Sequence, residues 1–197
     1  MTFAKIGERT LATNGFLTMR EKSFRVNGVD YRRTVVEHPG AVVIVPLLTN
    51  GRVVVVRQFR PSVERHLIEL PAGKCDVPGE ELLTTAEREL QEECGLKADR
   101  LELVGSFLNS PGFTNETTHV VIALGLSDAP LAPQSVEEED MQIRALSIGA
   151  LGEFSALQEL DDGKSIVGIT LSKLYLLQHG LDPSNYPESA SVRERFS

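Results

Sequence analysis

Two runs of β-branched residues constrain the fold of this chain more than any other feature. Residues 41–48 read AVVIVPLL and residues 53–59 read VVVVRQF. Valine and isoleucine are enriched in strands, because their branched side chains suit a pleated, half-buried surface. Residues 49–52 (TNGR) join the runs, and Asn-Gly between two such runs is a strong signal for a β-hairpin. The sequence therefore predicts a hairpin over residues 41–59.

Other segments alternate between strand-like and helix-like patterns. The expected helices have apolar residues at helical spacing and end at Gly or at Asp-Asp-Gly. We predict further strands at residues 10–24, 31–36, 101–108 and 118–126, and helices at residues 82–93, 150–160 and 165–179. This mixture predicts an α+β or mixed α/β sandwich in one domain. The polar, proline-containing tail from residue 181 onward is expected to fray.

Length and charge limit the classes of partner. The chain has 197 residues, which favours one domain at roughly 150 residues per domain. Its formal net charge of −8 repels the phosphates of nucleic acids and anionic membrane surfaces, so neither is an expected partner. No apolar run approaches the roughly 18 residues of a membrane helix, and the first ten residues (MTFAKIGERT) lack the apolar core of a secretory signal. We expect a cytoplasmic protein.

The two cysteines give little support for a structural role. Cys75 and Cys94 have neither the close spacing nor the histidine neighbours of a zinc site. Two cysteines are also too few for a disulfide scaffold, so we expect both thiols to be reduced.

The predicted helix at residues 82–93 carries an apolar stripe beside an acidic strip. On a helical wheel, one stripe is expected to face the core, and it consists of Leu82, Leu83, Ala86 and Leu90. Glu89 and Glu93 lie four residues apart on the edge of this stripe, with Glu92 beside them. These three glutamates, called the acidic strip below, share one partly shielded side of the helix.

The acidic strip predicts a bound cation. Like charges at this spacing repel by roughly 0.2–0.5 kcal/mol per exposed pair. We place Arg88 on the outer side of the helix, so no basic residue is expected on the line between Glu89 and Glu93. Hard divalent cations prefer oxygen ligands, and the strip suits Mg²⁺ or Mn²⁺. The alternative is an acidic face that is simply solvated.

The wider segment resembles the signature of the Nudix hydrolases. Gly73 is followed by six residues and Glu80, and then by seven residues and the run RELQEECGL at residues 88–96. The family pattern usually has five residues between its first Gly and first Glu, and one extra loop residue is easily absorbed. The resemblance implies a Nudix-type α/β/α sandwich, and it marks residues 73–96 as a loop-helix-loop that binds metal and diphosphate.

Flanking residues resemble one branch of this family, the ADP-ribose pyrophosphatases. They are HLIELPAG at residues 66–73, VRQFR at residues 56–60, and Pro111, which lies fifteen residues beyond Leu96. The resemblance implies Mg²⁺-dependent hydrolysis of ADP-ribose to AMP and ribose 5-phosphate, with Mn²⁺ as a substitute. A broader nucleoside diphosphate sugar hydrolase and a non-catalytic ADP-ribose sensor remain as alternatives.

The resemblance also implies a set of metal ligands. Glu89 and Glu93 would be the principal ligands, and Glu92 would serve a second site or the attacking water. The backbone carbonyl of Ala72 would complete the shell. Arg88 looks structural and is expected to brace Glu80 or Glu92 rather than touch the substrate.

The substrate-binding residues that we predict are Arg57, Arg60, Glu69, Pro111 and Phe113. Arg57 and Arg60 would supply fixed positive charge to a diphosphate. The loop at residues 111–113 would place an aromatic ring over the pocket. The alternatives are an exposed strand end for the two arginines and an ordinary turn for the loop.

A second acidic cluster at residues 137–140 (EEED) is expected in a loop. In the resembled branch a glutamate of that loop positions or deprotonates the attacking water. This implies that Glu138 is catalytic, with Glu139 as the second choice and Glu92 in a supporting role. The alternative is a solvated acidic loop.

We divide the chain into an N-terminal strand arm at residues 1–35, a Nudix domain at residues 36–181 and a polar tail at residues 182–197. In the resembled branch the N-terminal strands cross to a second subunit, which implies a homodimer with shared pockets for a small nucleotide sugar. An intramolecular sheet would explain the same apolar pattern. Phe24 and Tyr31 are the candidates for stacking on a base, since the chain has no Trp.

Overall fold

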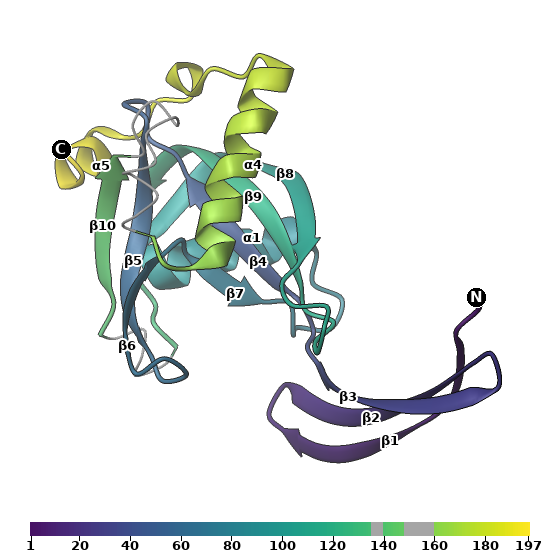
Figure 1. Cartoon of the computed structure of the whole chain (residues 1–197). Helices are drawn as coiled ribbons and strands as arrows, with labels where there is room; N and C mark the ends of the chain where they lie inside the picture. Colours follow the sequence, from purple (N-terminus) through teal and green to yellow (C-terminus); the bar gives the residue numbers. More distant parts are fainter. Residues whose placement is uncertain (135–139, 148–159) are drawn as a thin grey trace.

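The computed structural model describes residues 1–134, 140–147 and 160–197. It consists of a body, in which helices pack on two β-sheets, and a separate N-terminal sheet called the arm (Figure 1). Most of the helix predicted at residues 150–160 falls outside the described residues. Within the described part of the chain, no helix is long and apolar enough to cross a membrane.

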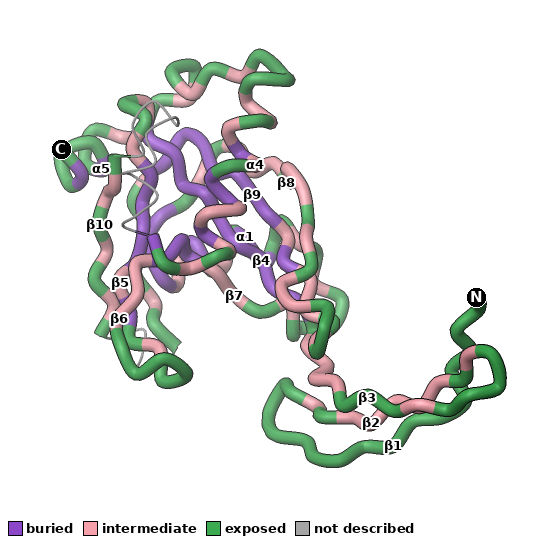
Figure 2. Tube along the Cα trace, in the orientation of Figure 1, coloured by how far each residue is buried: buried purple, intermediate pink, exposed green. Residues whose placement is uncertain are grey.

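The arm is a three-stranded antiparallel sheet in the order β1-β2-β3. Its strands are β1 (Ala4–Asn14), β2 (Leu17–Val26) and β3 (Val29–Glu37). The single strand predicted over residues 10–24 is wrong, because a turn at Gly15, with a φ of 55°, divides it in two. Asn27 and Gly28 have φ values of 49° and 78°, the positive values that a tight two-residue hairpin requires. Figure 2 shows that β1 is exposed along its whole length, whereas most of β2 has intermediate exposure.

The body contains two sheets. The larger one has the order β7-β4-β9-β8, with β4 (Ala41–Pro46), β7 (Ala72–Lys74), β8 (Leu96–Leu108) and β9 (Thr117–Asp128). The smaller one has the order β10-β5-β6, with β5 (Arg52–Arg60), β6 (Arg65–Glu69) and β10 (Gln142–Ser147). The strands predicted at residues 101–108 and 118–126 are confirmed as the antiparallel pair β8 and β9.

The predicted hairpin over residues 41–59 is wrong. Strand β4 pairs with β7 and β9, whereas β5 pairs with β6 and β10. The Asn50-Gly51 turn does form, and the backbone N–H of Leu48 donates to the carbonyl of Arg52 at 2.9 Å. However, all six residues of β4 are buried, as are Val53 to Val56 of β5. Strands that are apolar on both faces need cover on both faces, so the turn carries the chain from one sheet to the other.

Two helices cover opposite faces of β4. The helices are α1 (Leu82–Cys94) and α4 (Gly163–His179), and both were predicted. Val42 and Ile44 belong to the core cluster that contains Leu90 of α1, whereas Val43 and Val45 belong to the cluster that contains Ile169 of α4. Side chains alternate between the two faces of a strand, so this division gives the α/β/α layers that the resemblance implied.

The C-terminal tail is ordered against the body, contrary to the expectation that it frays. It forms a 3₁₀ helix (Pro183–Asn185) and the helix α5 (Ala190–Arg195). Val192 and Phe196 are buried in the core. The buried carboxylate of Glu188 accepts hydrogen bonds from the backbone and hydroxyl of Thr49 at 3.1 and 3.0 Å. Burial of two apolar side chains in an otherwise polar segment therefore fixes the tail in place.

Candidate active site

Helix α1 presents the acidic strip to a cavity because the apolar stripe next to the strip is buried in the core. Ala86 and Leu90 are fully buried, as the apolar stripe predicts. The prediction was wrong for Leu83, which is 40% exposed. The helix ends at Gly95, whose left-handed φ of 62° lets its N–H bond back to the carbonyl of Gln91 at 2.9 Å.

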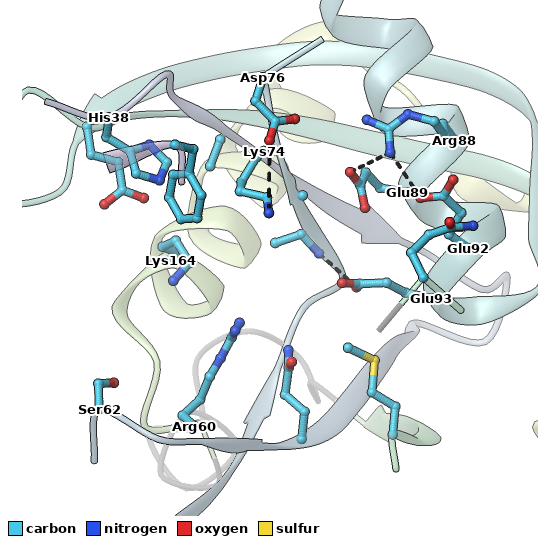
Figure 3. Close-up of a pocket in the computed structure, with 18 residues that line it drawn as sticks. His38, Arg60, Ser62, Lys74, Asp76, Arg88, Glu89, Glu92, Glu93 and Lys164 are labelled. Atoms are coloured by element: carbon cyan, nitrogen blue, oxygen red, sulfur yellow. Dashed lines mark hydrogen bonds and ion pairs between the residues drawn. The ribbon is translucent and has the colours of Figure 1, made fainter. Parts of the chain in front are cut away.

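The cavity next to the strip has a volume of about 620 Å³. The strip, Glu89, Glu92 and Glu93, forms one side of it, and the carboxylates of Asp76 and Glu116 also line it. Its basic side consists of Arg60 from β5, Lys74 from β7 and Lys164 from α4. Figure 3 shows the side chains of both sides pointing into one space. Opposed acidic and basic walls suit a ligand that combines a cation with an anion.

Arg88 is closer to the acidic strip than the sequence predicted. Its Nη1 lies 2.7 Å from Glu89 and 2.9 Å from Glu92, and its other nitrogens bond to Glu80 at 3.2 and 3.1 Å. The hydrogen bond with Glu80 is the largest cause of the raised pKa of Arg88. We placed Arg88 on the outer side, but its long side chain reaches round the helix. The expected bracing of Glu80 and Glu92 is present, and it orients Glu89 as well.

Two close contacts join the strip to strand β7. Glu93 is only 7% exposed, and its carboxylate accepts a hydrogen bond from the backbone N–H of Ala72 at 3.1 Å. Glu89 lies directly over Gly73, where a Cβ atom would come within 1.8 Å of the Glu89 carboxyl carbon. Only glycine leaves room for this carboxylate, so the loop and the helix position the strip together.

The strip has the donor chemistry of a magnesium site. Carboxylate and carbonyl oxygens are the ligands that hard divalent cations prefer, and Ala72 brings its backbone beside Glu93. Among the described residues, no three acidic, histidine or cysteine side chains form a complete ligand set. Mg²⁺ is usually held by one or two carboxylates, with water and substrate phosphates as further ligands. The residues present therefore fit an ion that shares its ligands with a substrate.

Arg60 lines the cavity, and Glu69 holds it there. Their side chains form two hydrogen bonds of 2.8 and 2.6 Å, and Glu69 is 1% exposed. Hydrogen bonding to this carboxylate raises the pKa of Arg60. Glu69 is committed to Arg60 and does not line the cavity. Arg57 does not line it either, because residues 57 and 60 point to opposite faces of β5. Gln58, on the same face as Arg60, does.

The loop that carries Pro111 and Phe113 lies beside the arm instead of the cavity. The carbonyl of Phe113 accepts a hydrogen bond from Val36 at the end of β3, at 2.8 Å. Its ring is 57% exposed, and neither residue lines the cavity. The structure thus brings together Arg60, Ala72 and the acidic strip, and leaves this loop apart from them.

An aromatic residue that the sequence did not single out does reach the cavity. Phe16, in the β1–β2 turn, lies over the ammonium of Lys74 at 4.6 Å and packs edge-on against His38 at 5.2 Å. Burial lowers the pKa of His38; the negative charge of Glu116 opposes this shift, and the positive charges of Lys74 and Lys164 add to it. The predicted stacking candidates Phe24 and Tyr31 stack on each other instead, with ring centroids 5.6 Å apart.

Glu138 and Glu139 lie outside the described residues. The nearest described residues on either side, Gln134 and Asp140, can be placed. Gln134 lines the cavity, as does Met141. Asp140 lies 3.4 Å from the imidazole of His66. The role predicted for the two glutamates therefore stays a prediction.

An acidic helix that faces basic side chains in an α/β/α sandwich suits one class of protein, the metal-assisted hydrolases of phosphate compounds. Comparison with known proteins names the family within this class. A family model described as the NUDIX domain matches residues 37–165, so the chain belongs to the Nudix family and is a Nudix hydrolase. Nudix hydrolases generally use divalent metal cations.

Curated relatives cover most of the chain. A methanol dehydrogenase activator from Bacillus methanolicus is 31% identical over 85% of this chain and 93% of its own length. ADP-ribose pyrophosphatases from Bacillus subtilis (strain 168) and Mycobacterium tuberculosis are 35% and 36% identical, over 75% and 85% of this chain and 80% and 81% of their own. A crystal structure of an ADP compounds hydrolase superimposes with a TM-score of 0.78 at 20% identity, covering 91% of this chain and 97% of that one. This likeness confirms the expected fold.

Proposed function

We propose that this protein hydrolyses the diphosphate of ADP-ribose to AMP and ribose 5-phosphate, with Mg²⁺ as its natural cation and Mn²⁺ as a substitute. The observation that carries the proposal is the cavity, in which the acidic strip of α1 faces three basic side chains. A diphosphate with a divalent cation matches both sides of this cavity. The names of the relatives from Bacillus subtilis and Mycobacterium tuberculosis support ADP-ribose as the compound.

Each wall of the cavity has a separate task in this proposal. Glu89, Glu93 and the carbonyl of Ala72 would hold the ion, with Glu92 beside them. The bound ion would neutralise charge on the diphosphate and lower the pKa of the attacking water. Arg60, oriented by the buried Glu69, would bind the diphosphate from the opposite wall. Arg57, Pro111 and Phe113 lie outside the cavity and are not part of the proposal.

A general base that accepts the proton of the attacking water would speed the reaction further. We assign this task to Glu138, with Glu139 as the second choice. Gln134 and Met141, which lie on either side of this pair in the sequence, both line the cavity, and this supports the assignment. Because the metal lowers the pKa of the water in any case, replacing Glu138 should slow the reaction without abolishing it.

A substrate panel tests this function. The protein is incubated with Mg²⁺ and with ADP-ribose, GDP-mannose or UDP-glucose, and the phosphate released by added phosphatase is measured. We expect the highest kcat/KM for ADP-ribose and no hydrolysis in excess chelator. If kcat/KM for ADP-ribose is below the values for the other two compounds, the substrate assignment is wrong, but the assignment to the Nudix family is unaffected. Binding without hydrolysis of any compound would favour a regulatory role, which the name of the Bacillus methanolicus relative suggests for that protein.

We also propose that two chains form a homodimer through the arm, residues 1–35. All eleven residues of β1 are exposed, and β1 is an edge strand of its sheet. Phe3, just before β1, and Leu17 and Met19 of the paired strand β2 are also exposed. An exposed edge with apolar side chains is a liability unless another chain covers it.

Both cysteines are free thiols, as we expect for action in the reducing cytoplasm.

Light scattering tests the assembly. We expect twice the 21.6 kDa mass of one chain. Deletion of residues 1–30 should then give a monomer with a raised KM for ADP-ribose, because the partner's arm would no longer complete the pocket. A monomeric mass for the full chain, or an unchanged KM after deletion, would contradict the shared pocket.

A further inference from the structure

Lys164, on the basic side of the cavity, has fewer interactions with other described side chains than Arg60 and Lys74 have. Arg60 is held in two hydrogen bonds by the buried carboxylate of Glu69. Lys74 is covered by the ring of Phe16 and lies 3.9 Å from Asp76. Lys164 points into the same space from the start of α4 (Figure 3).

The ammonium of Lys164 has capacity for a further acceptor. Its Nζ lies 3.3 Å from one oxygen of Asp162. The other oxygen of Asp162 accepts hydrogen bonds from the backbone and the hydroxyl of Ser165, at 2.9 and 2.7 Å. An ammonium has three N–H donors, and among the described residues Asp162 is its one hydrogen-bonding partner. The side chain is only 26% exposed, so a ligand in the cavity is well placed to supply the other acceptors.

The position of Lys164 is fixed by its neighbours along the helix. Ser165 is fully buried, and its hydroxyl accepts a hydrogen bond from the backbone N–H of Leu70 at 2.8 Å. Gly168 lets α4 approach closely, since a Cβ there would come within 2.9 Å of the Leu70 side chain. Leu70 lies two residues before Ala72, so the start of α4 is tied to the same segment that carries the proposed metal ligand.

We propose that Lys164 binds the diphosphate oxygens of the substrate that face away from the acidic strip. This inference rests on the proposed function and deepens it, because it assigns a phosphate-binding side chain from outside the signature. A charged ammonium has no lone pair, so it serves neither as a metal ligand nor as a proton acceptor. An anion is its most favourable partner, and Lys164 faces the strip across the space in which the diphosphate would lie.

The cavity needs such a cation for electrostatic reasons. Three carboxylates stand on the opposite wall, and Arg88 is bonded to two of them. A divalent ion can screen the strip from those phosphate oxygens that it binds. The remaining oxygens need donors of their own, because removal from water without a partner is costly. Charge-assisted hydrogen bonds from lysine supply them.

Kinetics of variants at Lys164 test this assignment. Lys164→Met keeps the unbranched shape and most of the length of the side chain but removes its charge, so we expect KM to rise about 10- to 100-fold, with a much smaller change in kcat. Lys164→Arg should recover most of the loss. Lys173→Met is the matched control, because Lys173 lies on the same helix outside the cavity, and its KM should stay unchanged.

A second readout separates phosphate binding from a structural role. Inhibition by ADP, which carries a diphosphate, should weaken in Lys164→Met, whereas inhibition by adenosine should not. Equal weakening for both ligands, or an unchanged KM, overturns the inference. The kinetics are run on whichever member of the substrate panel the wild type hydrolyses best. Failure of ADP-ribose as that substrate would therefore reject the proposed function and still test Lys164. If the wild type neither hydrolyses nor binds any member, both proposals fall.

Discussion

Glu93→Gln is expected to lower kcat on ADP-ribose about 10³-fold with little loss of stability. Glu93 is nearly buried beside the backbone of Ala72, where it accepts a hydrogen bond. Glutamine keeps the size of the side chain and one acceptor oxygen, so the contact with Ala72 can persist. The charge that would hold the cation is lost.

The matched control for this change is Glu87→Gln, on the exposed side of the same helix. Steady-state rates and thermal unfolding are measured for both variants and the wild type. Nearly normal turnover of Glu93→Gln in Mg²⁺ would remove Glu93 from the metal site. A loss of turnover equal in both variants would point to a general effect of helix charge.

Gly73→Ala is expected to lower kcat about 100-fold while the fold persists. The added Cβ would come within 1.8 Å of the carboxyl carbon of Glu89 and 2.0 Å of one of its oxygens. The end of a flexible side chain can move aside, so the cost falls on the position of the carboxylate and not on the core. A displacement of about 1 Å in a catalytic group can cost about 10²-fold in rate.

The control for this change is Gly7→Ala, since a Cβ at Gly7 has no neighbour within 4 Å. Neither glycine has a positive φ, so alanine introduces no backbone strain at either position. Activity and the urea midpoint of unfolding are compared. If Gly73→Ala keeps full activity, the contact between Gly73 and Glu89 does not position the strip. If the midpoint falls steeply, the contact supports the fold instead.

Features that depend on local pattern could be predicted from the sequence. Helix α1 was predicted because apolar residues recur at helical spacing over residues 82–93, and the position of the acidic strip follows from the same spacing. The pairing of β4 was not predictable in this way. An Asn-Gly turn is local, but the choice of partner depends on which sheet can cover a strand that is apolar on both faces. The prediction that the tail frays was wrong for a similar reason, since Val192 and Phe196 are buried by residues that are far away in the sequence.

The residues that a motif marks lie together in the structure, whereas residues placed by the tertiary fold were not singled out from the sequence. Glu89, Glu93 and Ala72 belong to one segment, and all three line the cavity. Arg57 was grouped with Arg60, although the two-residue period of a strand puts them on opposite faces and favours Gln58. Lys164 carries no local signal, because its position in the cavity depends on how α4 packs on β4. Phe16 reaches the cavity through the path of the arm, which a local pattern does not encode.

A Mn²⁺ titration tests most directly whether the acidic strip is a metal site. Binding is measured by calorimetry for the wild type, Glu93→Gln and Glu87→Gln, without substrate and then with ADP. We expect the wild type and Glu87→Gln to bind Mn²⁺ alike, Glu93→Gln to bind it at least about tenfold more weakly, and ADP to tighten binding in the wild type. Equal Mn²⁺ affinity in all three proteins would contradict a metal site on the acidic strip.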